Sequence, residues 1–232
     1  MKKFLTAIGL SAVAAGSVSA QNLNGPYEDP AANAIYQLLF CDRLSLFKDD
    51  FEGDLVEPWK TLFAEDASSN DLAKIAADTK LESRQRALAY GLLRKRGKEV
   101  PKGVILGTIV EVHLPEGLDT LAVFTDGSVR YINHTGKMVF VEGKGHSFEA
   151  EAKDVIEASQ TVVDAIGPWD KDRLAAPIKG NIRMSFLVSD GLYFGEGTIE
   201  TIYADNLSGP MIKAAEVLLL KLIEQSVGKR SE

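Results

Sequence analysis

The sequence predicts an α+β protein: an antiparallel sheet of about six strands with helices on one face, preceded by a helical N-terminal layer. Two observations support this class. Apolar residues recur with a helical period before residue 103 and with a period of two from residue 104. The dipeptides Asp126-Gly127 and Asp190-Gly191 are strong signals for hairpin turns. No parallel crossover is required, so we expect a four-stranded meander followed by a hairpin.

The N-terminal layer is expected to cover residues 21–103. Asp29-Pro30 is typical of an N-cap followed by proline at the first helical position, and the helix that follows is apolar nearly all round. The last helix of the layer ends at Gly97, with basic residues in its final turn. The expected helices cover residues 30–47, begin at residues 57–59 and 69–71, and cover residues 81–96.

The sheet region is expected to cover residues 104–232 and to form one compact unit with the helical layer. In its first strand, alternation places Leu106 and Val110 on one face and Ile109 and Glu111 on the other. A helix with a single apolar stripe follows the meander, and another closes the chain. The expected strands are 104–114, 118–125, 128–133, 137–142, 181–189 and 192–203, with helices over 149–166 and from 208 onward.

Residues 1–20 have the pattern of a secretory signal peptide. Lys2 and Lys3 precede an apolar stretch, and small residues end the segment at Ala20. We therefore expect cleavage after Ala20 and a periplasmic or secreted product. No cysteine follows the small residues, which argues against a lipid anchor, and no later segment is apolar enough to span a membrane. The mature chain is expected to be soluble.

Charge is unevenly distributed along the chain. The 232 residues carry a net charge of −7, which argues against nucleic acid or an anionic membrane surface as the main partner. Residues 80–102 nevertheless contain 8 basic and 2 acidic side chains, a net of +6. This segment is either a solvated helix face or a docking surface for an acidic partner.

Cys41 is the single cysteine of the chain, so no internal disulfide can form. It lies in an apolar run of the first expected helix, where a thiol usually behaves as a small buried hydrophobic group. The alternatives are a reactive thiol or a bridge to another molecule. The first interpretation predicts slow labelling of the native protein.

A polar group at one rim of the sheet is the predicted ligand-binding site. Loops on a rigid scaffold are where binding residues collect. The alternative is a purely structural role, in which these residues form turns and pair with strand neighbours. The candidate ligand-binding residues are Arg130, Asn133, His134, Asp190 and Tyr193.

The same rim contains the weak catalytic candidates. His134 is a possible general base, with Asp126 or Asp190 to orient it. The chain has no nucleophile-elbow pattern around a serine. Its three histidines are too far apart in sequence to form a helical metal-binding pair, so neither a metal nor a cofactor is predicted.

Several segments resemble a family of uncharacterised exported bacterial proteins. They are YQLLFCDRLSLFK (36–48), DGSVRYINHTGK (126–137), IGPWDK (166–171) and GNIRMSFLVSDGLYFGEG (180–197). The resemblance implies a shared fold and suggests that the segments at the rim of the sheet belong together. It supplies no catalytic residues.

The sequence favours an exported binding or accessory module over an enzyme. Its partner would be a protein or a small ligand of the cell envelope. One alternative is a hydrolase of envelope material that uses the His134 and Asp pair. Another is a structural subunit that docks through residues 80–102. The oligomeric state stays open.

Overall fold

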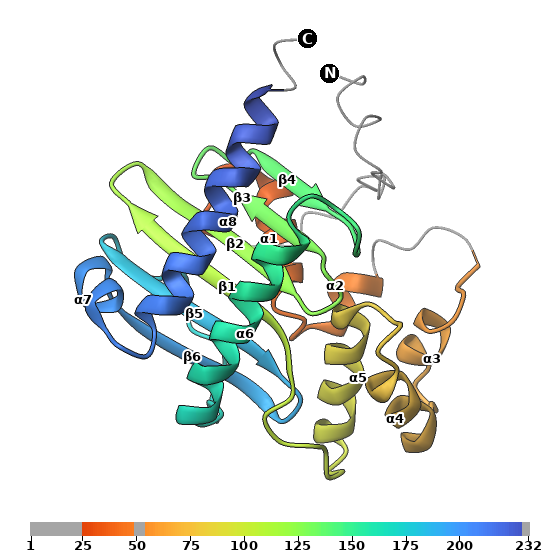
Figure 1. The fold of residues 1–232 in the computed structure, drawn as a ribbon. Coiled ribbons are helices and arrows are strands. Elements are labelled where there is room, and N and C mark those ends of the chain that lie inside the picture. Colours follow the sequence, from red (N-terminus) through yellow and green to blue (C-terminus); the bar gives the residue numbers. More distant parts are fainter. Residues whose placement is uncertain (1–24, 49–53, 229–232) are drawn as a thin grey trace.

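The computed structural model describes residues 25–48 and 54–228. The signal peptide predicted for residues 1–20, with cleavage after Ala20, lies outside the described residues. The described part is a three-layer structure, in which one six-stranded antiparallel sheet has helices on both faces (Figure 1). The α+β class is therefore confirmed. The helical N-terminal layer covers the second face of the sheet, a placement that the sequence did not specify.

The sheet has the strand order β4-β3-β2-β1-β5-β6, and every neighbouring pair is antiparallel. The meander and the hairpin that the turn signals predict are both present, and β1 joins them by pairing with β5 as well as β2. The strands are β1 Ile105–Leu114, β2 Gly117–Phe124, β3 Val129–Ile132, β4 Met138–Val141, β5 Asn181–Val188 and β6 Gly191–Thr198.

The N-terminal helices pack on one face of the sheet and enclose the first core. Asp29 caps the first of them by accepting a hydrogen bond from the backbone N–H of Ala31, as its sequence signal predicts. Tyr36 and Leu62 are among the side chains buried there, with Ile109 from the sheet. The helices are α1 Pro30–Leu39, α2 Leu44–Lys48, α3 Trp59–Phe63, α4 Ser69–Ala77 and α5 Ser83–Lys95.

Three C-terminal helices cover the other face of the sheet and enclose the second core (Figure 1). Val155 and Leu218 have no exposed surface, and Val110 lies opposite them on the sheet. The apolar stripes of the two long helices predict this packing, because a helix buries its apolar side against another element. The helices are α6 Glu149–Ala165, α7 Ile199–Ala204 and α8 Gly209–Gly228.

Two expected elements differ from the structure. The helix expected over residues 30–47 is broken into α1 and α2, and Cys41 between them has a left-handed backbone conformation (φ 52°). The strand expected over residues 192–203 ends at Thr198, whose side chain accepts a hydrogen bond from the N–H of Thr201 and caps α7. The apolar residues Ile199, Ile202 and Tyr203 continue beyond this cap, but they belong to α7 and not to the strand.

The first strand contains an irregularity that alternation cannot predict. The register of β1 against β5 shifts between Ile105 and Gly107. As a result Leu106 lies in the first core beside Ile109, instead of sharing a face with Val110. A Cβ atom on Gly107 would lie 2.7 Å from Cδ1 of Phe124, so glycine permits the close approach of β1 and β2 here.

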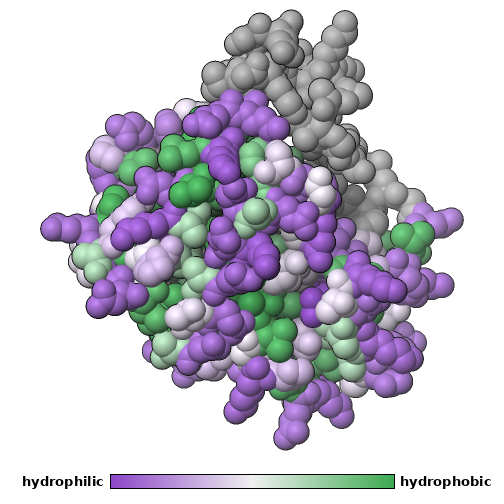
Figure 2. Space-filling model, in the orientation of Figure 1, coloured by the Kyte–Doolittle hydropathy of each residue, from purple (hydrophilic) through white to green (hydrophobic). Residues whose placement is uncertain are grey.

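Polar side chains dominate the molecular face that carries α6 and α8, and apolar groups form small separate patches on it (Figure 2). Within residues 25–48 and 54–228, no helix is both long and apolar enough to cross a membrane.

Candidate functional site

The antiparallel ladder divides the predicted rim between the two ends of the sheet. Asp126 lies in the β2–β3 turn and Asp190 in the β5–β6 turn, at the end where β1 begins. Asn133 and His134 lie in the β3–β4 turn at the opposite end. The structure therefore does not bring the predicted binding residues into one group.

His134 has a different carboxylate partner from those predicted. Its backbone N–H donates to Oδ1 of Asp119 at 2.7 Å, and its ring Nδ1 lies 3.3 Å from the same oxygen. Asn133 organises the same turn, since its side-chain oxygen accepts from the N–H groups of Thr135 and Lys137. The predicted pairing of His134 with Asp126 or Asp190 is not formed. Asn133 and His134 instead make the local hydrogen bonds that are typical of turn residues.

Arg130 and Asp126 are both held in structural contacts. The Arg130 guanidinium is buried and donates to both carboxylate oxygens of Glu142 at 2.8 Å, and to the carbonyl oxygen of Val141 at 2.9 Å. Burial lowers the pKa of Arg130. Asp126 accepts from the backbone N–H of Ser83 at 2.7 Å, which ties the start of α5 to the β2–β3 turn. These contacts agree with the interpretation that strand and turn residues pair locally.

Asp190 and Tyr193 do lie together, as the sequence predicts. The two oxygens of Asp190 accept from the N–H of Gly103 at 3.1 Å and from the hydroxyl of Tyr193 at 3.0 Å. Burial and this carboxylate raise the pKa of Tyr193. Asp190 is also the one predicted binding residue that lines a large cleft beside α5.

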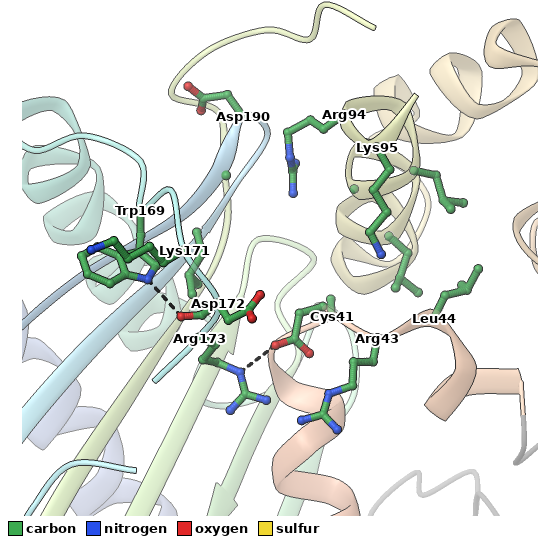
Figure 3. A pocket seen from close by; sticks show the side chains of 16 residues that line it. Cys41, Arg43, Leu44, Arg94, Lys95, Trp169, Lys171, Asp172, Arg173 and Asp190 are labelled. Atoms are coloured by element: carbon green, nitrogen blue, oxygen red, sulfur yellow. Dashed lines mark hydrogen bonds and ion pairs between the residues drawn. The ribbon is translucent and has the colours of Figure 1, made fainter. Parts of the chain in front are cut away.

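This cleft, called the anion cleft below, has a volume of about 660 Å³. It opens between the segment after α1, the helix α5, the β5–β6 turn and residues 169–175, which we call the cleft segment (Figure 3). Its volume falls within the range of small-molecule sites. The charged side chains that line it are Arg43, Arg94, Lys95, Lys171, Arg173, Asp42, Asp172 and Asp190.

The balance of charge in the anion cleft is positive. Asp42 is neutralised by Arg173, whose Nε lies 2.7 Å from Oδ2. Asp190 is occupied by the two hydrogen bonds described above. Lys95 makes no ion pair with any residue that the structure describes. Cationic groups therefore remain available to an anion, in a chain whose net charge is −7.

Arg94 is positioned by a hydrogen bond to the β5–β6 turn. Its Nη1 donates to the carbonyl oxygen of Ser189 at 2.6 Å, which fixes the guanidinium beside the β5–β6 turn. Burial lowers the pKa of Arg94, and Asp190 nearby opposes that effect. Arg94 and Lys95 extend from the last turn of α5 toward the opening of the cleft (Figure 3).

Trp169 builds the opposite wall. Its backbone N–H donates to the carbonyl oxygen of Leu192 at 2.7 Å, and its indole N–H donates to that of Asp172 at 3.0 Å. The ring meets Phe194 edge-on with centroids 4.9 Å apart, and Lys171 lies over it at 5.4 Å. These contacts attach the N-terminal end of the cleft segment to strand β6.

The cleft is assembled from segments that sequence reasoning did not combine. The net charge of +6 over residues 80–102 does point to Arg94 and Lys95. Nothing in the sequence indicates that residues 41–44 and 169–173 face them, because that proximity depends on how helices pack on the sheet.

Cys41 borders the cleft but is buried, at 8% exposed, as predicted. Burial raises the pKa of its thiol to about 12. The thiolate is the reactive form, so we expect an aromatic disulfide reagent at neutral pH to label the native protein at least about 100-fold more slowly than the unfolded chain. Equal rates in the absence and presence of denaturant would contradict this.

Two further findings concern metals and relatives. Among the residues the structure describes, no group of three or more histidine, cysteine or acidic side chains is arranged to hold a metal ion. No protein-family profile matches the chain, and neither a curated protein nor a solved structure is significantly similar to it.

Proposed function

We propose that this protein is an exported binding module whose anion cleft takes a small ligand with carboxylate or phosphate groups. The observation that carries the proposal is a positively charged cleft of about 660 Å³ in an acidic chain. The exported location rests on the signal-peptide pattern of residues 1–20, which are outside the described residues.

The chemistry of the lining supports an anionic ligand. A guanidinium already fixed by one hydrogen bond, as Arg94 is by Ser189, loses little further freedom when it binds an anion. Lys95 beside it adds a second positive charge on a flexible stem. A ligand with two or more anionic oxygens can contact both, and the volume of the cleft limits it to a small molecule.

The proposal is tested by calorimetric titration of the mature protein with citrate and with inorganic pyrophosphate. These probes represent the carboxylate and phosphate classes. The double variant Arg94→Ala/Lys95→Ala is expected to weaken binding at least about 10-fold, because each charge-assisted hydrogen bond contributes about 1.5–3 kcal/mol. Binding of neither probe at millimolar concentration would overturn the proposal.

A charge-matched control separates the cleft from the basic segment as a whole. Lys98→Ala/Lys102→Ala removes the same two charges from exposed positions that do not line the cleft. This variant is expected to change the affinity less than about twofold at physiological ionic strength, because exposed charges are screened. An equal loss in both double variants would favour docking through residues 80–102 and contradict a site in the cleft.

A further inference from the structure

Glu111 in β1 has no exposed surface, and one of its two carboxyl oxygens has no hydrogen-bond partner. The hydroxyl of Tyr36 donates to Oε1 at 2.6 Å, whereas Oε2 is buried without a hydrogen-bond partner. A buried carboxylate that lacks donors is strongly disfavoured in its charged form. Burial accordingly raises the pKa of Glu111, and the neutral acid is favoured.

Charged and titratable groups from several elements surround Glu111. Arg183 is its direct cross-strand partner in the β1–β5 ladder, where Cβ atoms are about 5 Å apart. It is therefore the cation best placed to approach the free oxygen of an ionised Glu111. The groups facing Glu111 are Tyr27 from the segment before α1, Tyr36 from α1, Arg173 from the cleft segment, Arg183 from β5 and Glu196 from β6.

Arg183 is occupied by other acceptors while Glu111 is neutral. Its Nε and Nη2 donate to Oε2 of Glu196 at 2.8 and 2.6 Å. Its Nη1 donates to the backbone carbonyl oxygens of Leu174 and Ala175. These two carbonyls belong to the cleft segment, so one buried guanidinium anchors the C-terminal end of that segment to the sheet.

We propose that ionisation of Glu111 draws Arg183 from the carbonyl oxygens of Leu174 and Ala175 to Oε2, and thereby loosens the cleft segment. The proton passes to solvent, and no covalent bond other than O–H changes. An ionised carboxylate at this depth needs a cation, and Arg183 lies directly across the ladder. The cleft segment carries Lys171 and Arg173 on the wall of the anion cleft, so raising the pH weakens that wall.

The direction of the pH effect follows from the raised pKa. Because Glu111 binds its proton more tightly in the folded protein than in the unfolded chain, it imposes no penalty below its ordinary value of 4.5. The penalty grows as the pH rises toward the folded-state pKa and is constant above it. The segment is therefore held at low pH and released at high pH.

Amide hydrogen exchange of the ligand-free protein tests this switch. Protection factors of residues 169–175, corrected for the intrinsic exchange rate, are expected to fall about 10-fold between about pH 5 and pH 9 in the wild type. In Glu111→Gln, which cannot ionise, they are expected to stay constant. A wild-type profile without a transition, or an identical transition in Glu111→Gln, would overturn the proposal.

A second variant keeps the proposal testable if Glu111→Gln does not fold. Tyr36→Phe removes the donor that stabilises the charged carboxylate, so the midpoint of the transition is expected to move to higher pH. Tyr27→Phe is the matched control, because its hydroxyl bonds to Thr120 instead, and the midpoint should stay in place. Loss of protection at every pH without a shift of the midpoint would show a structural role only and refute the switch.

The effect on ligand affinity rests on the proposed function and is measured separately. The affinity for citrate and pyrophosphate, expressed relative to Glu111→Gln at each pH, is expected to fall about 10-fold over the same range. Relating the values to the variant removes the titration of the probes themselves. A transition in protection without binding of either probe refutes the proposed function alone, and binding without a transition refutes the switch alone.

Discussion

Arg183→Met is expected to lower the free energy of unfolding by about 3 kcal/mol. The Arg183 side chain is buried, at 7% exposed, so the substitution removes a buried cation and leaves the partly exposed carboxylate of Glu196 unpaired. It also leaves two carbonyl oxygens of the cleft segment without their donor and deprives Glu111 of its cross-strand cation. Urea denaturation monitored by circular dichroism measures the change.

The double variant Arg183→Met/Glu196→Gln is the control for this result. Removing the orphaned charge is expected to restore about 1–2 kcal/mol, since much of the cost comes from the unpaired carboxylate instead of the lost contact. A loss below about 1 kcal/mol in Arg183→Met, with no recovery in the double variant, would show that the pair is solvated and contradict the buried position of Arg183.

Phe186→Ala is expected to cost about 4 kcal/mol of stability. Phe186 in β5 has no exposed surface and belongs to the second core, between the sheet and the helices α6 and α8. Truncation removes most of a large side chain and leaves a cavity that close-packed neighbours fill only in part. The loss is measured by the same denaturation experiment.

Leu220→Ala supplies the comparison for Phe186→Ala. Leu220 lies in α8 but is 54% exposed, so its truncation is expected to change stability by less than about 0.5 kcal/mol. Similar losses in the two variants would contradict the position of α8, with one side on the sheet and the other in solvent.

Elements specified by nearby residues are the ones the sequence predicts. Asp29-Pro30 begins α1 through a local hydrogen bond, and the dipeptides Asp126-Gly127 and Asp190-Gly191 lie in the turns of the two predicted hairpins, where Gly127 has a positive φ of 88°. These interactions span only a few residues, so they operate whatever the rest of the chain does. The α+β class follows from them together with the change in the period of apolar residues near residue 103.

The parts that sequence reasoning missed depend on distant contacts. The anion cleft combines residues 41–44 with α5 and with the cleft segment. The predicted rim residues are divided between the two ends of the sheet, because consecutive turns of a meander lie at opposite ends. The left-handed conformation of Cys41 and the register shift in β1 are set by packing, which overrides local propensity. The sequence placed Glu111 on one face of the first strand, but it did not indicate that the side chain is fully buried.

The strand order has a consequence for how the chain folds. The turns of the meander and of the β5–β6 hairpin close short loops, whereas β1 meets β5 only after the chain has passed through α6. Closing the larger loop costs more conformational entropy, so the two hairpin units are expected to assemble before the β1–β5 seam. Glu111 and Arg183 face each other across that seam, so their desolvation is deferred until this last pairing.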